Sequence, residues 1–401
     1  MDKLIVTQWR GKVCTAVSSK SGITQIMMEP EDSSSLLNNI YIGKVQKVVG
    51  NINAAFVDIG DGRTGYYSLD ENKEHIFVSQ STGKLKAGDE IVVQVSRDAV
   101  KTKAPVLTGK LAFTGRYCVL TVGKTGVGFS AKIGDNGYKA RIKAVLKEVL
   151  SGEEESFGVI VRTNGAGVAD EVLLKEYEHL KGLYSKLAAE ASCRTCYSCI
   201  YRAVPGYISA IRDSYSGTLD GIITDIPEYH RELKAYLEQY QAEDAGKLSF
   251  YEDKLLPLTK LYSIDTAVER ALGKHVWLKS GGYLVIEPTE AMVVIDVNTG
   301  KYAGKKNMRE TICRINMEAA EEIGRQLRLR NLSGIILIDF IDMEQEEDRE
   351  MLMRHLGEVV SRDPVKTTVV DMTRLNLVEV TRKKVRKPLY EQVLPPSDKT
   401  Q

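Results

Sequence analysis

The order of elements in the last third of the chain constrains its fold more than any other feature. Residues 291–297 (AMVVIDV) alternate like a strand, residues 308–329 have the period and composition of a helix, and residues 334–341 (GIILIDFI) are almost wholly apolar. Such an apolar strand is typical of a covered sheet. Strand–helix–strand order predicts that the two strand ends lie side by side. Residues 282–286 are predicted to form a hairpin with the first strand.

Two acidic residues interrupt these apolar strands, Asp296 in the first and Asp339 in the second. Asn298 shares a face with Asp296 because side chains alternate along a strand, whereas Asp342 is predicted to be a cap or turn residue. A bound cation offsets the cost of burying carboxylates, and magnesium prefers a sparse shell of carboxylates and water. The pattern alone leaves a second explanation open, in which the two residues cap strand ends or pair with arginine.

Earlier in the chain, residues 39–121 contain short strands separated by glycine-rich turns. This spacing is typical of a small barrel, and an OB-type barrel that binds single strands needs aromatic and basic side chains on one face. The candidates are Phe56, Tyr66, Tyr67 and Lys103, although Phe56 fits a core position equally well.

A second candidate site follows in residues 158–167 (GVIVRTNGAG). Arg162 and Thr163 stand at a strand end before two glycines, which suits a pocket for a terminal phosphate. A surface turn is the alternative.

Composition limits the classes of protein to which the chain can belong. Its 401 residues are too many for one ordinary core, and no apolar run reaches membrane-spanning length, so we expect several subdomains in a cytoplasmic protein. The net charge of +1 means that an RNA surface must come from local clusters, such as the basic run in residues 382–387. The spacing of Cys193, Cys196 and Cys199 is that of half a metal site, but no second pair of cysteine or histidine ligands follows nearby. We therefore expect these cysteines to be reduced.

Five segments, in this order, together resemble the ribonuclease E/G family: NINAAFVDIGDGRTGYY, FGVIVRTNGAG, EAMVVIDVNTGKYAG, NMEAAEEIGRQLRLRNLSGIILIDFIDM and MTRLNLVEVTRKKVRKPL. The resemblance covers nearly all of residues 1–387. It implies an α/β fold of several subdomains, listed here with their ranges: an RNase H-like subdomain (1–35 and 209–271), an inserted S1-type OB barrel (36–118), a 5′-sensor region (119–208), a DNase I-like catalytic subdomain (272–387) and a flexible tail (388–401).

The resemblance also implies the chemistry. It makes Asp296 and Asp339 the ligands of one Mg²⁺ per active site, which Mn²⁺ can replace, and it gives Asn298 a part in placing the attacking water. The implied RNA contacts are a 5′-monophosphate pocket of Arg162, Thr163 and Val119, and further contacts through Phe56, Tyr66, Lys103 and Lys366.

One departure from the family pattern concerns zinc. Family members carry a C-P-x-C motif shortly after the segment that matches TRKKVRKPL, whereas this chain continues as LYEQVLPPSDKTQ and has no cysteine after Cys313. We therefore expect no zinc and a homodimer, if one forms, that zinc does not link. The long disordered scaffold of ribonuclease E is also absent, which places the chain nearer to the ribonuclease G branch.

The expected activity is magnesium-dependent endonucleolytic cleavage of single-stranded RNA, stimulated by a 5′-monophosphate and leaving 3′-hydroxyl and 5′-phosphate ends. The expected substrates are rRNA precursors and mRNA, in rRNA processing and mRNA decay, with no membrane partner. Two other classes stay open, a non-catalytic single-stranded RNA-binding protein and a DNA nuclease. Retention of Asp296, Asn298 and Asp339 favours the enzyme.

Overall fold

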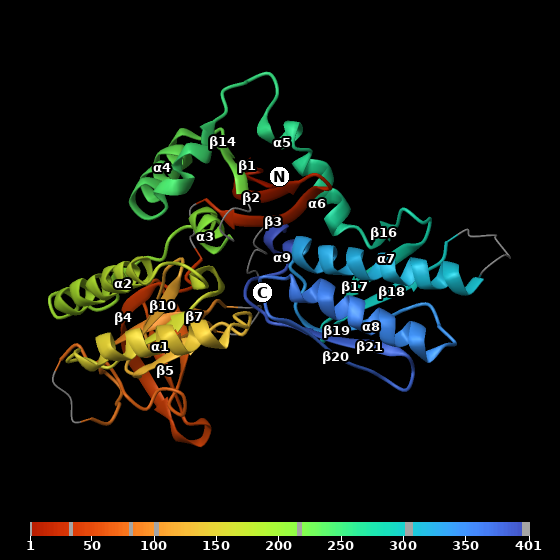
Figure 1. Ribbon diagram of the computed structural model, residues 1–401. Coiled ribbons are helices and arrows are strands. Elements are labelled where there is room, and N and C mark those ends of the chain that lie inside the picture. Colours follow the sequence, from red (N-terminus) through yellow and green to blue (C-terminus); the bar gives the residue numbers. More distant parts are fainter. Residues whose placement is uncertain are drawn as a thin grey trace. The chain divides into compact units, whose positions relative to one another are not determined.

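A computed structural model describes residues 2–31, 35–79, 83–99, 104–214, 219–300 and 308–394 (Figure 1). The chain divides into two compact units. Unit 1 combines Met1–Ser33 with Gly217–Gln401, and unit 2 is the continuous segment Ser34–Ser216. Unit 2 is therefore an insertion between two parts of unit 1. No helix among the described residues has the length and apolar character needed to cross a membrane.

The first sheet of unit 1 joins the start of the chain to residues far along it. Its strands, in spatial order, are β15 (Leu248–Phe250), β14 (Leu219–Thr224), β1 (Asp2–Trp9), β2 (Lys12–Ser19) and β3 (Gly22–Pro30). β1 pairs with β14 in parallel and with β2 in antiparallel register. The tight β1–β2 turn uses Gly11 at φ +71°, a backbone conformation that glycine adopts without strain.

Short helices cover this sheet and close its core. They are α4 (Pro227–Tyr240), α5 (Leu258–Leu261), α6 (Ile264–Leu272) and α9 (Leu389–Val393). Trp9, Leu258, Leu329 and Leu389 share one buried cluster. The expected flexible tail is therefore wrong for residues 388–394, because apolar burial of Leu389 holds α9 in place; residues 395–401 lie outside the described part of the chain.

The second sheet of unit 1 has six strands. In spatial order they are β16 (His275–Trp277), β17 (Tyr283–Pro288), β18 (Val293–Asn298), β19 (Gly334–Asp339), β21 (Leu377–Arg382) and β20 (Thr367–Met372). β17 and β18 form the predicted hairpin, and β18 and β19 are parallel neighbours. Helix α7 (Met308–Leu329) lies between β18 and β19 in the chain, and α8 (Glu346–Ser361) follows β19. The predicted strand–helix–strand unit is confirmed.

Both long helices pack on one face of this sheet, as Figure 1 shows. The core contains Ile336 and Ile338 of β19 together with Ile315 of α7 and Leu352 of α8. The opposite face is open, and Ile335 is 51% exposed there. The expectation of a covered sheet is thus correct for one face only, because the alternate residues of the apolar run point away from the helices.

Unit 2 contains a closed five-stranded barrel. Its strands run in the order β4 (Ile40–Val49), β5 (Ala54–Asp58), β6 (Thr64–Ser68), β8 (Val106–Thr108) and β7 (Glu90–Arg97), and pairing of β4 with β7 closes the ring. Val57, Tyr67 and Val93 fill its interior. The structure is therefore mixed α/β with a barrel of the size and closure expected for an OB-type subdomain.

The rest of unit 2 is a four-stranded sheet with helices. The sheet order is β11 (Gly126–Phe129), β12 (Phe157–Val161), β10 (Cys118–Val122) and β9 (Ala112–Thr114). The helices are α1 (Asn136–Ser151), α2 (Asp170–Ala191) and α3 (Gly206–Asp213), and β13 (Cys199–Tyr201) pairs with β4 of the barrel.

Two predicted boundaries need correction. Strand β9 falls in the range predicted for the barrel, but it pairs with β10 of the neighbouring sheet. Residues 209–216 fall in the range predicted for the RNase H-like subdomain, but they belong to unit 2, where Asn164 donates a hydrogen bond to the carbonyl of Ser214. Turn residues in a sequence mark where a strand ends. The subdomain to which a strand belongs depends instead on the strand with which it pairs, and turn composition does not reveal that pairing.

Candidate active site

The two acidic residues of the strand–helix–strand unit stand directly opposite each other. Asp296 of β18 and Asp339 of β19 are register partners in the parallel ladder. Neighbouring strands lie about 4.8 Å apart, and partners in register point to the same face. That face is the open one, because Ile295 and Ile338, one position earlier on each strand, are fully buried in the helix-covered core. The structure therefore brings the two carboxylates together at the ends of their strands.

Asn298 lies on the same face and contacts the first carboxylate. Its Nδ2 donates a hydrogen bond to Oδ2 of Asp296 at 2.7 Å. This bond restrains the Asp296 carboxylate and leaves the amide oxygen of Asn298 available as an acceptor. Asp342 lies in the loop after β19, where it accepts a hydrogen bond from Asn376 Nδ2 at 3.2 Å, in agreement with its predicted turn position.

The electrostatics of this carboxylate pair favour a cation. Desolvation raises the pKa of Asp339 above its ordinary value, and the negative charges of Asp296 and Asp342 raise it further. None of the ion pairs among the described residues involves Asp296 or Asp339. Of the two alternatives that the pattern leaves open, pairing with arginine is therefore absent there, and capping of the strand ends is not tested.

The donor set fits a hard cation that keeps much of its water. Within the described ranges, no three His, Cys, Asp or Glu side chains are grouped closely enough to form a complete protein cage. Magnesium needs no such cage, because it commonly binds one or two carboxylates and retains several waters. Asp296 and Asp339 would hold it, with Asn298 beside them.

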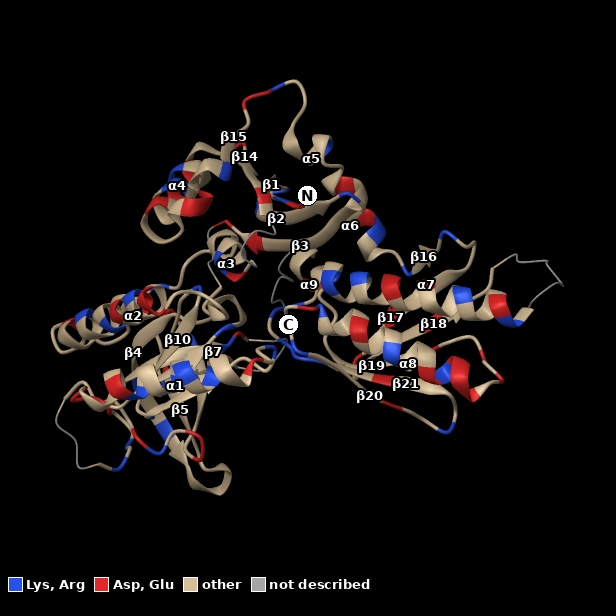
Figure 2. Ribbon diagram, viewed as in Figure 1, with Lys and Arg blue, Asp and Glu red and all other residues tan. Residues whose placement is uncertain are grey.

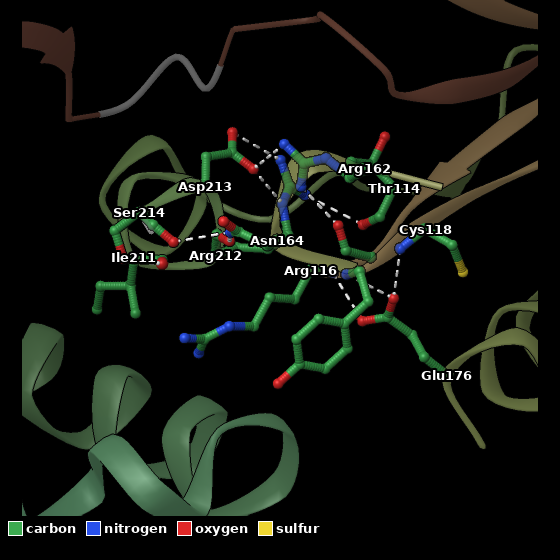
Figure 3. Close-up of polar contacts among 12 residues, drawn as sticks. Thr114, Arg116, Cys118, Arg162, Asn164, Glu176, Ile211, Arg212, Asp213 and Ser214 are labelled. Atoms are coloured by element: carbon green, nitrogen blue, oxygen red, sulfur yellow. Dashed lines mark hydrogen bonds and ion pairs between the residues drawn. The ribbon is translucent and has the colours of Figure 1, made fainter. Parts of the chain in front are cut away.

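A second polar cluster surrounds Arg162 in unit 2 (Figure 3). Its guanidinium donates to the carbonyl of Gly115 at 2.6 Å and forms an ion pair with Asp213 at 2.8 Å. Arg212 contacts the same carboxylate through Nε at 3.0 Å. Burial raises the pKa of Asp213, but the charges of Arg212 and Arg162 outweigh it and hold the pKa below its ordinary value. Two guanidinium groups thus share one carboxylate.

The loop beside Arg162 is held from helix α2. The carboxylate of Glu176 accepts backbone hydrogen bonds from Arg116, Tyr117 and Cys118, at 2.7, 2.8 and 2.8 Å (Figure 3). Because three N–H groups converge on one carboxylate, the loop that supplies the Gly115 carbonyl to Arg162 has a defined conformation.

The other residues predicted for this pocket lie close by. Thr163 Oγ1 and Ser130 Oγ are 2.9 Å apart and share a hydrogen bond. Val119 is a register partner of Ile160, which is 43% exposed on β12 just before Arg162. The sequence pattern did not indicate Asp213, Arg212 or Glu176, because each joins the cluster through folding from a distant segment.

The predicted RNA-contacting aromatics stand on the outer surface of the barrel. Phe56 and Tyr66 are register partners on β5 and β6, with ring centroids 6.2 Å apart. Lys47 Nζ lies 5.0 Å from the Phe56 ring centroid, a contact that the sequence pattern did not reveal. Tyr67, the other aromatic candidate, is fully buried in the barrel and cannot meet a ligand. Lys103 lies outside the described residues.

The basic segment after β21 is less uniform than its sequence suggests. Arg382 is buried and forms an ion pair with Asp363 at 2.8 Å, so it is not part of an exposed basic track. Lys366 is exposed beside Lys383, at the end of the sheet opposite to Asp339. Figure 2 shows acidic and basic residues interspersed along α7 and α8, in keeping with the net charge of +1.

Comparison with known proteins places this geometry in a family. Residues 112–385 match the model of the Ribonuclease E/G family. The chain is similar to ribonuclease G of Haemophilus influenzae, at 36% identity over 380 residues, covering 92% of this chain and 76% of that protein. It is 34% identical to ribonuclease G of Escherichia coli K12 over 378 residues, with the same coverage of each chain.

Ribonuclease E of Nostoc sp. (strain PCC 7120) is 33% identical over 361 residues, covering 88% of this chain and 52% of that protein. The residues that match the family model include both strands that carry the paired carboxylates. The chain is a member of the ribonuclease E/G family.

Proposed function

We propose that this protein is a magnesium-dependent endoribonuclease that cuts single-stranded RNA and leaves 3′-hydroxyl and 5′-monophosphate ends. As a member of the ribonuclease E/G family, the chain is an endoribonuclease, a hydrolase of phosphodiester bonds. The observation that carries the finer proposal is the pairing of Asp296 with Asp339 on the open face of the sheet. Their negative charges repel each other, and among the described residues neither carboxylate forms an ion pair with a basic side chain.

In this proposal Asp296 and Asp339 hold the metal, and Asn298 orients Asp296. A bound divalent cation supplies positive charge at the phosphate, where negative charge develops during hydrolysis. The amide oxygen of Asn298 accepts a hydrogen bond from the attacking water and helps to align it with the phosphorus. Attack by this water breaks the bond between phosphorus and the 3′-oxygen, which leaves with a proton as the 3′-hydroxyl.

Most of the proposed RNA contacts lie in unit 2, whereas Lys366 lies in unit 1. Phe56 and Tyr66 offer aromatic surfaces to bases, and Lys103 and Lys366 are proposed phosphate contacts. Arg162 and Thr163, with Val119 beside them, bind the 5′-monophosphate of the RNA and stimulate cleavage. The geometry supports this role because Arg162 and Arg212 together place more positive than negative charge around Asp213.

The proposed setting is the cytoplasm, with rRNA precursors and mRNA as substrates in rRNA processing and mRNA decay. One Mg²⁺ serves each active site, and Mn²⁺ is expected to replace it. We propose no role for zinc.

The test is cleavage of a short, A/U-rich, 5′-monophosphorylated RNA with magnesium and with EDTA. The protein should make internal cuts with magnesium only. Asp296→Asn and Asp339→Asn should each abolish cleavage and leave RNA binding within about twofold of the parent, because these changes remove charge from an exposed face without creating a cavity. Full activity of either variant contradicts the metal site.

Two further outcomes separate the alternatives. A folded protein that binds the RNA without cutting it under any of these conditions is a non-catalytic RNA-binding protein. Cleavage of a DNA oligonucleotide of the same sequence at a similar rate points to a nuclease that does not select the sugar.

A further inference from the structure

An aromatic pair stands on the same open face as the carboxylates. Trp277 of β16 and Tyr283 of β17 are register partners, and their ring centroids lie 5.1 Å apart. His275 adds a third ring, 5.8 Å from Tyr283. Trp277 is 71% exposed, which is unusual for the largest amphipathic side chain in a protein.

The strand register connects this pair to the candidate active site. Tyr283 is the direct partner of Asn298, and Val285, two residues further along β17, is the partner of Asp296. Trp277 is therefore two strands away from Asn298 in the same row of the sheet. Two strand spacings amount to about 10 Å, a span that about one or two nucleotides bridge.

The turn that joins Trp277 to Tyr283 is held tightly. Within it, the Leu278 N–H donates to the carbonyl of Gly282 at 2.8 Å, and the Leu278 side chain is buried in the core. From helix α7, the Glu318 carboxylate accepts the N–H groups of Lys279 and Ser280, at 2.6 and 3.1 Å. The two aromatic rings are consequently presented by a rigid support.

The same turn touches the backbone just beyond Asn298. A Cβ atom added at Gly300, where φ is +66°, would lie 2.2 Å from the carbonyl oxygen of Gly281. Only glycine permits this close approach. The aromatic pair and the end of β18 are thus coupled through backbone contact, so that the rings keep their position relative to Asn298 and Asp296.

We propose that Trp277 and Tyr283 form a stacking platform for one nucleobase of the RNA, close to the phosphate that is cut. This proposal rests on the ribonuclease function proposed above. Flat aromatic surfaces bind bases of single strands by stacking, and Lys279, exposed in the turn between the two rings, adds positive charge for the backbone. The platform places a base at a fixed distance from the carboxylates and so helps to select the bond that is cut.

Tryptophan fluorescence tests this platform directly. The chain has 2 tryptophans, and the other one, Trp9, is 5% exposed and donates to Asp265 at 2.9 Å. Titration with the single-stranded RNA in EDTA, where no cleavage is expected, should quench the emission of Trp277. The variant Trp277→Phe, which retains Trp9 alone, should show no quenching. Oligonucleotides that carry one abasic position each should identify the stacked nucleotide by loss of the quenching.

Kinetics provide the second readout. Trp277→Ala should raise KM by roughly 5- to 150-fold, the equivalent of about 1–3 kcal/mol for one stacked base, and change kcat less. Trp277→Phe should restore most of the loss, since it keeps a ring. The matched control is Phe250→Ala, which removes another exposed aromatic of unit 1, 37% exposed and in contact with the His230 ring, and should leave KM unchanged.

The outcomes separate the platform from the ribonuclease function. Cleavage by the unaltered protein, without quenching of Trp277 and with an unchanged KM for Trp277→Ala, overturns the platform and leaves the nuclease intact. Quenching that depends on one base, in a protein that never cuts RNA, supports the platform and overturns the nuclease.

Discussion

At the scale of single residues, the candidate sites differ in how their charges are balanced. Asp296 and Asp339 are register partners and form no ion pair among the described residues, whereas Arg162 forms an ion pair with Asp213. We propose that the first arrangement binds a metal cation, and that the second, in which Arg162 and Arg212 surround one carboxylate, binds the terminal phosphate of the RNA.

The role of Arg162 is testable through the 5′ end of the substrate. Arg162→Ala should reduce the preference for 5′-monophosphate over 5′-hydroxyl RNA to near unity, because the pocket loses its main charged donor. Arg162→Lys should recover little of the preference, since a lysine has a single charged nitrogen where the guanidinium contacts both the Gly115 carbonyl and Asp213.

The measurement is the ratio of cleavage rates for the two RNAs at equal concentration. A matched control is Arg141→Ala, which removes an arginine of the same unit that pairs with Asp170 and is 54% exposed. An unchanged ratio in Arg162→Ala removes Arg162 from the sensing of the 5′ end.

At the scale of elements, one buried ion pair links the ends of several strands in the second sheet of unit 1. Arg382 at the end of β21 pairs with Asp363, which follows α8, and both side chains are 3% exposed. Arg382 also donates to the carbonyl of Leu332 at 3.0 Å, just before β19. Asp363 in turn accepts the N–H of Val365 at 2.8 Å, just before β20.

Loss of one partner should therefore be costly. Asp363→Ala should lower the free energy of unfolding by about 3–5 kcal/mol, because it leaves the buried Arg382 charge uncompensated. Urea denaturation, followed by circular dichroism, measures this change. The control is Glu228→Ala on α4, which breaks an exposed pair with Arg231 and should cost at most about 1 kcal/mol. Equal, small effects of both changes would show that the buried pair contributes little.

The elements that could be predicted were those with a strong period. Helix α7 was predicted with its observed ends, Met308–Leu329, and the parallel strands on either side of it put Asp296 opposite Asp339. The limits of the helix follow from local sequence and the strand–helix–strand order predicts neighbouring strand ends, whereas the register of the two strands comes from the structure. The open face of the sheet could not be predicted, because the run around Ile335 is apolar on both faces and only the positions of α7 and α8 decide which face is covered.

The parts of the sites that escaped prediction depend on partners far away in the chain. The sequence places Arg382 in a basic run, and its burial against Asp363 follows only from the fold. Trp277 lies in a strand of three residues with no period to interpret, and its significance comes from the register that links it to Asn298. Glu176 carries no local signal that it binds a loop some 60 residues earlier.

At the scale of the whole molecule, the division into two units predicts independent folding of the inserted one. Unit 2 is continuous and has its own buried clusters in the barrel and in the four-stranded sheet. A fragment of residues 34–216 should therefore fold alone, with a cooperative thermal transition and β-rich circular dichroism. The same fragment should bind single-stranded RNA with an affinity that falls as salt is added, since phosphate contacts release counterions.

The fragment should not cut RNA, because Asp296 and Asp339 belong to unit 1. Phe56→Ala in the same fragment should weaken RNA binding without unfolding the fragment, because Phe56 is a proposed RNA contact that lies outside the buried cluster of the barrel. A fragment that shows no cooperative transition would mean that unit 2 needs unit 1 in order to fold.

The parallel pairing of β1 with β14 also sets an order of events on the ribosome. Strand β1 ends at Trp9 and its partner starts at Leu219, so at about 5–20 residues per second β1 waits roughly 10–40 s for that partner to be made. The inserted unit is complete before then. The strands with the carboxylates emerge later still, so the nascent chain completes its inserted unit well before it contains both Asp296 and Asp339.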